Sequence, residues 1–226
     1  MSASSQRNTL QLSNWTEMSA WTPDFKRGSA MFEVEAIVDT PLITGQGKPS
    51  IAHVNSSMAL EVMLVTAVVE GNHDQFARLY DLYAPLVHGI LLARVPRNEV
   101  DDLVQDIFLH ALKKLHKLRD RAAFGPWIAM IARNRAMDFH RRSREPVEIT
   151  EDLGTTNSSG AKAREMLDII RSLPDAYRET LVLRLVEGMT GPEISTRTGL
   201  TPASVRVNLH RGMKLLREKL GFGEGL

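Results

Sequence analysis

The chain has 226 residues, of which 43% are apolar and 24% are charged, and its formal net charge is +1. This composition is typical of a globular protein, and the small net charge indicates no partner by itself. Because the chain has no cysteine, it can form no disulfide, thiolate zinc site or iron–sulfur cluster.

The longest apolar run, residues 58–69, contains Glu61 and is shorter than the ~20 residues that span a membrane. The N-terminus also lacks the basic-then-apolar order of a signal peptide. We therefore expect a cytoplasmic protein that is not inserted into a membrane.

Residues 1–57 show no sustained hydrophobic periodicity and are rich in Ser, Thr, Gly and Pro. This composition predicts an N-terminal extension that is disordered or weakly structured. Met58 begins the first strongly patterned segment, and a translation start there is an alternative that the sequence leaves open.

Three amphipathic helices are predicted after this extension. Apolar residues follow helical spacing from Gln75, and a break at residues 95–98 precedes a second helix with Asn98 as its N-cap. The third helix runs from about Pro126 to Arg142, since proline suits a first helical turn. These helices define a first domain, residues 58–145.

An acidic and then Gly/Ser/Thr-rich stretch marks residues 146–163 as a linker. A second helical domain is predicted over residues 164–221. Thr190 and Glu193 have capping-box spacing before a short helix, Gly199 suits a left-handed turn, and Thr201 is placed to cap the last helix. The predicted fold class is all-α, with two small helical domains joined by a flexible linker.

The second domain contains a predicted helix-turn-helix in residues 191–212. Its last helix has Arg and Asn side chains of the kind that read guanine and adenine in the major groove. The alternative is an ordinary helical hairpin with a solvated polar face. The candidate duplex-DNA residues are Thr201, Ser204, Arg206, Asn208, His210 and Arg211.

The first domain contains a reversal of charge. Residues 99–106 hold four acidic residues and no basic one, whereas residues 113–144 hold ten Lys or Arg against Asp120 and Asp138, a net of +8. Such an imbalance is too one-sided for internal pairing and indicates a polyanionic partner. The interleaved aromatic residues suit unpaired bases, although Trp127 fits a core position better than a stacking platform.

Asp102, Asp106 and His110 lie at helical spacing on one face, the pattern of a metal or acid–base cluster. No motif of a hydrolase or of a phosphate-binding loop accompanies them. We therefore expect no catalytic residue, no metal ligand and no cofactor, and interpret the acidic face as a docking surface for a basic partner.

Three ordered segments resemble the bacterial sigma factors of the extracytoplasmic-function (ECF) group in the sigma-70 family. Residues 99–108 (EVDDLVQDIF) are similar to the segment that docks on the clamp helices of the largest polymerase subunit. Residues 127–142 resemble the segment that melts and reads the minus-10 element, and residues 173–211 resemble the domain that reads the minus-35 element.

The resemblance implies a role for each matched residue. It implies core RNA polymerase and promoter DNA as partners, with an anti-sigma factor as a further candidate. Asp101, Asp102, Gln105, Asp106 and Phe108 would bind polymerase, with Phe108 equally suited to the core. The single-strand set would be Arg119, Arg121, Trp127, Arg133, Asn134, His140, Arg141 and Arg142.

Three other functions remain as alternatives. A helix-turn-helix regulator that binds duplex DNA without polymerase would share the second domain. A helical protein–protein adaptor and, least favoured, a metal hydrolase complete the set.

Overall fold

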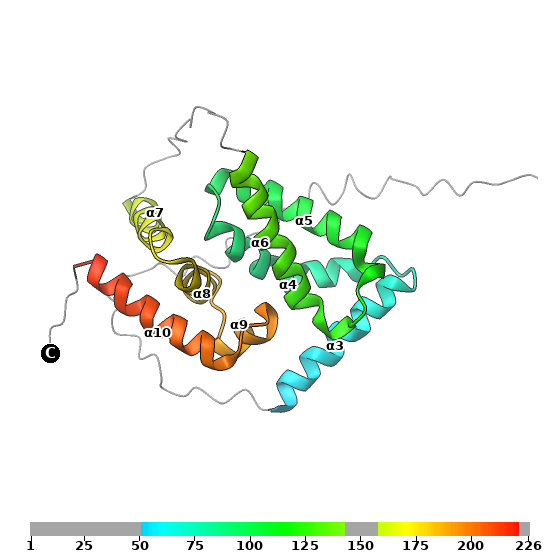
Figure 1. Cartoon of the computed structure of the whole chain (residues 1–226). Helices are drawn as coiled ribbons and strands as arrows, with labels where there is room; N and C mark the ends of the chain where they lie inside the picture. Colours follow the sequence, from blue (N-terminus) through cyan, green and yellow to red (C-terminus); the bar gives the residue numbers. More distant parts are fainter. Residues whose placement is uncertain (1–50, 143–157, 222–226) are drawn as a thin grey trace, which may run out of the picture. The chain divides into compact units, whose positions relative to one another are not determined.

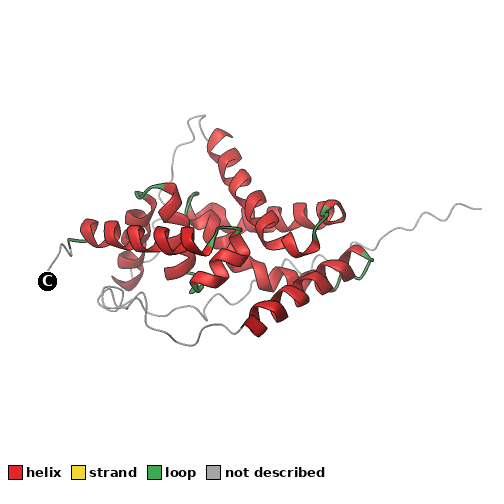
Figure 2. Ribbon diagram, turned by 60° about the horizontal axis from the view of Figure 1, so that its bottom comes forward, coloured by secondary structure: helices red, strands yellow, loops and turns green. Residues whose placement is uncertain are grey.

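The computed structural model describes residues 51–142 and 158–221, with side chains from residue 58 in the first range and residue 162 in the second. Every regular element in these ranges is helical, and they contain no strand (Figure 2). The predicted all-α fold class is confirmed. The extension of residues 1–50 lies outside the described residues.

Residues 51–142 form the N-terminal bundle, in which α4 contacts α3, α5 and α6 (Figure 1). Its core contains the fully buried side chains of Leu79, Leu86, Ile90, Phe124 and Ile128. The elements are α3 (Ile51–Val69), α4 (Gln75–Leu92), η3 (Arg97–Glu99), α5 (Val100–Lys114), η4 (Leu115–Lys117), η5 (Arg121–Ala123) and α6 (Phe124–Arg142).

Two boundaries in this bundle differ from the sequence prediction. Helix α3 begins at Ile51, before the predicted start of the first domain at Met58, because its first residues are polar enough to hide the helical pattern. The N-cap prediction for Asn98 is wrong, because residues 97–99 already form a 3-10 turn. A residue in such a turn lacks the extended backbone of an N-cap, and Asn98 Nδ2 instead donates to Glu99 Oε1 at 3.0 Å.

Residues 158–221 form the C-terminal bundle, in which α10 contacts both α8 and α9. Its helices are α7 (Ser158–Arg171), α8 (Asp175–Leu185), α9 (Gly191–Thr198) and α10 (Pro202–Lys219). Helix α7 begins inside the predicted linker, of which residues 146–157 lie outside the described part of the chain.

The local signals in the C-terminal bundle are confirmed. Thr190 and Glu193 form a reciprocal capping box at the start of α9. Gly199 has φ 77°, in the left-handed region that favours glycine. The Thr201 side chain accepts a hydrogen bond from the Ser204 N–H at 3.1 Å, which caps α10. The capping box begins α9, while Gly199 and Thr201 form the turn that ends α9 and begins α10, as the predicted helix-turn-helix requires.

The two bundles contact each other through α4 with α8 and through α6 with α9. Arg197 on α9 donates to the Leu82 carbonyl oxygen at 3.0 Å, and its guanidinium lies 5.7 Å from the centre of the Tyr83 ring.

Within the described ranges, no helix is long and apolar enough to cross a bilayer.

Candidate functional site

The acidic residues of α5 form a solvent-exposed face. Asp101, Asp102, Gln105 and Asp106 are all exposed, and the first two lie in the first helical turn. Carboxylates are favourable there because the helix N-terminus carries partial positive charge. Asp106 also makes an ion pair with Arg135 of α6, whose NH2 lies 2.6 Å from Oδ2.

Phe108 lies on the opposite, apolar side of α5. It is only 3% exposed, and its ring packs against Phe76 and Tyr80, with centroid distances of 6.2 and 4.5 Å. A side chain this buried cannot touch another protein directly. Of the two roles that the sequence left open for Phe108, the burial supports the core role, in which the residue holds α5 against α4.

The basic helix α6 is paired more than its composition predicts. Arg133 binds Glu179, Arg135 binds Asp106, and Arg141 binds Asp138 at 3.0 Å. The expectation that these arginines lack internal partners is wrong at these three positions, because two of the acids come from other helices. Asn134, His140 and Arg142 remain exposed, and His140 Nε2 lies 2.7 Å from the Arg94 carbonyl oxygen.

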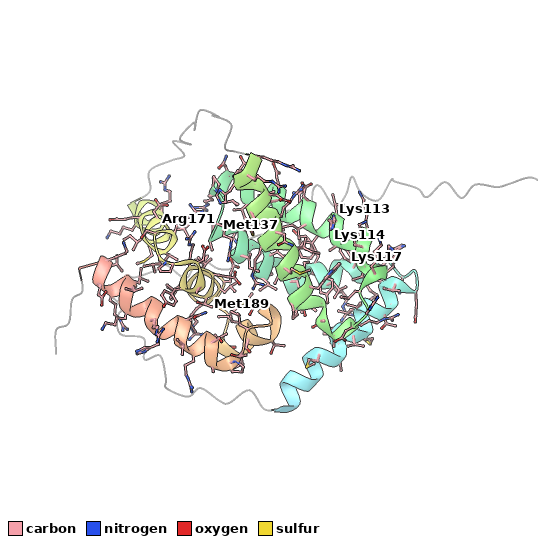
Figure 3. The ribbon with its side chains drawn as sticks, viewed as in Figure 1. Lys113, Lys114, Lys117, Met137, Arg171 and Met189 are labelled. Carbon is pink, nitrogen blue, oxygen red and sulfur yellow. The ribbon has the colours of Figure 1, made fainter. Side chains whose placement is uncertain are left out.

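The segment before α6 presents further cationic side chains. Arg119 is exposed and Arg121 is half-buried in η5, which Asp120 caps by accepting from the Ala122 N–H at 3.0 Å. Figure 3 shows Lys113, Lys114 and Lys117 gathered where α5 ends and η4 follows.

Trp127 is partly buried, so it has features of both a core residue and a stacking platform for bases. Its side chain is half-buried against the core, and its ring centre is 5.8 Å from that of Phe124. One part of the indole therefore serves the core, while the remainder reaches solvent on the same helix as Asn134 and Arg142.

Helix α10 turns one face inward and another outward. Val205, Gly212 and Met213 are buried, whereas Arg206, His210 and Arg211 are exposed. A Cβ on Gly212 would lie 3.1 Å from Leu181 Cδ1, so α10 packs closely on α8 along this line.

The exposed face of α10 contains only some of the predicted DNA-binding residues. Asn208 is half-buried at its flank, and the Thr201 and Ser204 hydroxyl oxygens lie 2.8 Å apart within the cap. Val207 was missed and is 41% exposed, one residue after Arg206 and four before Arg211. That spacing was the available signal, and an exposed apolar side chain suits the methyl group of thymine.

Two buried carboxylates were also missed. Glu61 of α3 is hydrogen-bonded to the Tyr83 hydroxyl and accepts from the Gly125 N–H at 3.3 Å. Burial raises the pKa of Glu61, and these hydrogen bonds only partly oppose the rise. The pKa of Tyr83 is raised as well, by burial and then by the neighbouring carboxylate.

Glu179 of α8 is 5% exposed and lies between Arg94 and Arg133. Burial alone would raise its pKa, but the hydrogen bonds and charges of Arg133 and Arg94 outweigh burial and hold the pKa below its ordinary value. No local pattern in the sequence marks this residue, since both of its partners are distant along the chain.

Among the described residues, no three His, Asp or Glu side chains gather closely enough to hold a metal ion. The predicted constellation around Asp102, Asp106 and His110 therefore receives no fourth or converging group from another segment. The structure instead gives Asp106 a cationic partner, Arg135.

Two family descriptions match the two bundles in order. Residues 79–145 match "Sigma-70 region 2", and residues 163–216 match "Sigma-70, region 4". The chain is also 35% identical over 162 residues to the RNA polymerase sigma factor CarQ of Myxococcus xanthus, covering 67% of this chain and 92% of CarQ. The chain belongs to the sigma-70 family, in its ECF group.

Further relatives agree with this assignment. The sigma factor is 28% identical to the ECF RNA polymerase sigma factor BldN of Streptomyces coelicolor, over 74% of this chain and 68% of BldN. It is 27% identical to the ECF RNA polymerase sigma-E factor of Haemophilus influenzae, over 70% and 93%. The solved structure of CnrH in complex with the cytosolic domain of CnrY shares the fold, with a TM-score of 0.55, 23% identity, and coverage of 73% and 99%.

Membership settles the class of function. The sigma factor is a non-enzymatic initiation factor that directs promoter-specific transcription by RNA polymerase. The N-terminal bundle contains region 2 and the C-terminal bundle contains region 4, and these names are used below for the two bundles. A regulator acting without polymerase, an adaptor and a metal hydrolase are no longer needed as alternatives.

Proposed function

We propose that region 2 docks on polymerase through the acidic face of α5. The observation that supports this most strongly is the separation of roles along α5: Asp101, Asp102, Gln105 and Asp106 are exposed, while Phe108 is buried. Carboxylates on one rigid face match a basic helical surface, such as the clamp helices of the largest subunit. Charge complementarity of this kind sets both the partner and the orientation of docking.

We further propose that α6 and the segment before it bind the unpaired minus-10 strand. Arg119, Arg121, Trp127, Asn134, His140 and Arg142 supply exposed or half-exposed cationic, polar and aromatic groups on continuous backbone. Backbone phosphates and splayed bases are bound by such mixtures, with stacking worth about 1–3 kcal/mol for each base. Arg133 and Arg141 belong to the same proposed set, although each has a carboxylate partner in the free chain.

Region 4 is proposed to anchor the duplex at the minus-35 element. Arg206, Val207, His210 and Arg211 form the exposed face of α10, and the helix N-terminus at Thr201 presents backbone N–H groups that suit a phosphate. Asn208 and Ser204 would contribute from the flank of this face.

The cytoplasm is the proposed place of action, which family membership supports. An anti-sigma factor is a proposed further partner. The solved structure of CnrH is a complex with the cytosolic domain of CnrY. A protein comparable to CnrY would be a candidate regulator for this chain.

The deciding experiment is reconstituted transcription with core polymerase, sheared genomic DNA of the source organism, and sequencing of the transcript starts. We expect starts that share upstream elements and require this chain. Asp102→Lys should then lower affinity for core polymerase by roughly tenfold or more, because close charge pairs at interfaces couple by ~1.5 kcal/mol or more. Asp74→Lys makes the same change of charge at an exposed site outside the acidic face.

Two results would contradict the proposal. Transcript starts identical with and without the chain would remove the initiating role of these surfaces. Equal loss of affinity in Asp102→Lys and Asp74→Lys would show a general charge effect and no docking face.

A further inference from the structure

Glu179 of region 4 is clamped between two arginines of region 2. Arg133 donates to both of its oxygens, from Nε to Oε2 at 3.1 Å and from NH2 to Oε1 at 2.7 Å. Arg94 NH2 lies 2.6 Å from Oε2. The side chains of Glu179, Arg94 and Arg133 are 6%, 17% and 29% exposed, so the carboxylate is almost withdrawn from water while its partners keep an edge in solvent.

Other polar groups of region 4 reinforce this contact. Arg171 of α7 donates from Nε to the Leu92 carbonyl oxygen at 3.0 Å and from NH2 to the Val95 carbonyl oxygen at 2.8 Å. These oxygens lie where α4 ends, and carbonyls at a helix C-terminus lack partners in their own helix. Glu187, which follows α8, lies 2.6 Å from His88 Nδ1. The contact between the regions is therefore built from matched polar groups as well as apolar packing.

Arg133 has two competing partners. It lies on α6, the helix proposed above to hold the unpaired strand, and its guanidinium already forks onto the Glu179 carboxylate. A phosphate has the charge and the paired oxygens that suit this same fork. One guanidinium edge cannot satisfy a carboxylate and a phosphate together, so region 4 and the DNA strand exclude each other at Arg133.

Arg94 is the second arginine that pairs with the carboxylate. Its backbone oxygen lies 2.7 Å from His140 Nε2, so the end of α4 and the last turns of α6 bring Arg94, Arg133 and His140 next to one another. We propose that Arg94 and Arg133 form a binding site for a backbone phosphate of the unpaired strand, and that Glu179 occupies this site in the free chain. The inference rests on the proposed role of α6 and adds Arg94 as a phosphate ligand.

In the full chain without polymerase, the affinity of region 2 for DNA is therefore limited by the fraction of molecules in which region 4 has moved away from Arg94 and Arg133. Opening replaces the Glu179 contacts with phosphate contacts of the same sign and geometry. A weakly populated open form lowers the apparent affinity in proportion to its population.

Gly89 provides a way to open the contact without changing any charge. A Cβ at this residue of α4 would lie 2.7 Å from Leu183 Cδ2 and 2.9 Å from Glu187 Cγ, both in region 4. Glycine also weakens a helix interior, so a larger residue favours α4 itself. Gly89→Leu should therefore displace region 4 while leaving region 2 folded.

The test uses the full chain and a fluorescein-labelled single-stranded oligonucleotide of mixed sequence, with affinity measured by anisotropy. Glu179→Gln and Gly89→Leu should each bind more tightly than the wild type, by about tenfold where the open form is about a tenth of the population. Asp175→Asn is the matched control, since Asp175 is an exposed acid on the same helix and pairs only with Arg178 in the described contacts.

A second measurement follows the opening itself. Because the chain has no cysteine, a dye pair can be attached through Met63→Cys in region 2 and Lys219→Cys in region 4, both exposed positions. Energy transfer should fall in Glu179→Gln and Gly89→Leu and stay at the wild-type value in Asp175→Asn.

The phosphate role of Arg94 is tested in the Gly89→Leu background. Arg94→Gln should lower the salt slope of oligonucleotide binding by about 0.7, the value for one lost phosphate contact on a single strand. Arg142→Gln in the same background tests the proposed DNA-binding role of α6 separately, since Arg142 is exposed and outside the contact.

Each outcome is decisive. Equal affinities for Glu179→Gln, Gly89→Leu and Asp175→Asn would overturn the occupied site. If the salt slope of oligonucleotide binding changes with Arg142→Gln but not with Arg94→Gln, only the phosphate-binding role of Arg94 would be overturned. A slope unchanged by both would instead overturn the proposed function of α6.

Discussion

The burial of Phe108 separates a core role from a docking role within one helix, and a pair of substitutions can measure the separation. Phe108→Ala removes a ring that is 3% exposed and makes two aromatic contacts, with Phe76 and Tyr80. Truncating a buried Phe to Ala costs about 3–5 kcal/mol, and each aromatic pair adds ~0.5–1.5 kcal/mol beyond its buried area. With two pairs lost, we expect a cost near the upper end, about 4–5 kcal/mol.

That cost is large for a domain of this size, whose total stability is roughly 5–13 kcal/mol. At a urea m-value of about 2 kcal/mol/M, the midpoint of unfolding should fall by about 2 M. Phe108→Leu keeps most of the apolar volume and should cost ~1–2 kcal/mol.

Tryptophan fluorescence can report region 2 alone. The three tryptophans are Trp15, Trp21 and Trp127, so replacing the first two by Phe leaves Trp127 on α6 as the probe. Affinity for core polymerase is measured in parallel without urea. We expect Phe108→Leu to bind as the wild type does. A variant of Phe108 that keeps its urea midpoint but loses polymerase affinity would refute the reasoning from burial.

Three further predictions concern region 4. Arg206→Ala and Arg211→Ala should each lower the slope of log affinity against log salt by about 0.9 on duplex DNA, and a slope equal to the wild type would show that the residue contacts no phosphate. Thr190→Ala removes half of the capping box with Glu193 and should lower the free energy of unfolding by ~1 kcal/mol, whereas Thr190→Ser should restore it; equal urea midpoints for both variants would argue against the cap. The pKa of Glu179 lies below its ordinary value of 4.5. The ionised carboxylate therefore contributes stability above pH 4.5, and this contribution is lost as the pH falls through the folded pKa. Energy transfer between the dye pair should fall over the same pH range in the wild type but not in Glu179→Gln.

The sequence predicted the parts of the fold that depend on neighbouring residues. The cap at Thr201 and the capping box at Thr190 are short-range features, because each side chain meets a backbone N–H three residues away. The left-handed turn at Gly199 depends only on the residue type at that position. Periodicity likewise located the helices from Gln75 onward, although a 3-10 turn moved the start of α5.

The contacts that the sequence did not predict join distant residues. Arg133 and Glu179 are 46 residues apart, and nothing in either local pattern indicates that they meet. The same holds for Glu61, a lone acid in an apolar helix whose partners lie 22 and 64 residues away. Charge counts along the chain gave the correct excess on α6 but could not show which arginines are neutralised by acids from other helices.

The Glu61 carboxylate also bears on how region 2 should be cut from the chain for laboratory work. It supplies an acceptor to the Gly125 N–H at the first turn of α6, a position where helices need external acceptors. The family match begins at residue 79, inside α4, and a fragment started there would keep Tyr83 and Gly125 without their shared acceptor. A fragment that begins at Ile51 retains α3 and this acceptor. Region 2 therefore extends upstream of the family match, because the Glu61 carboxylate and the buried side chains of Leu64, Val65 and Val68 all belong to its interior.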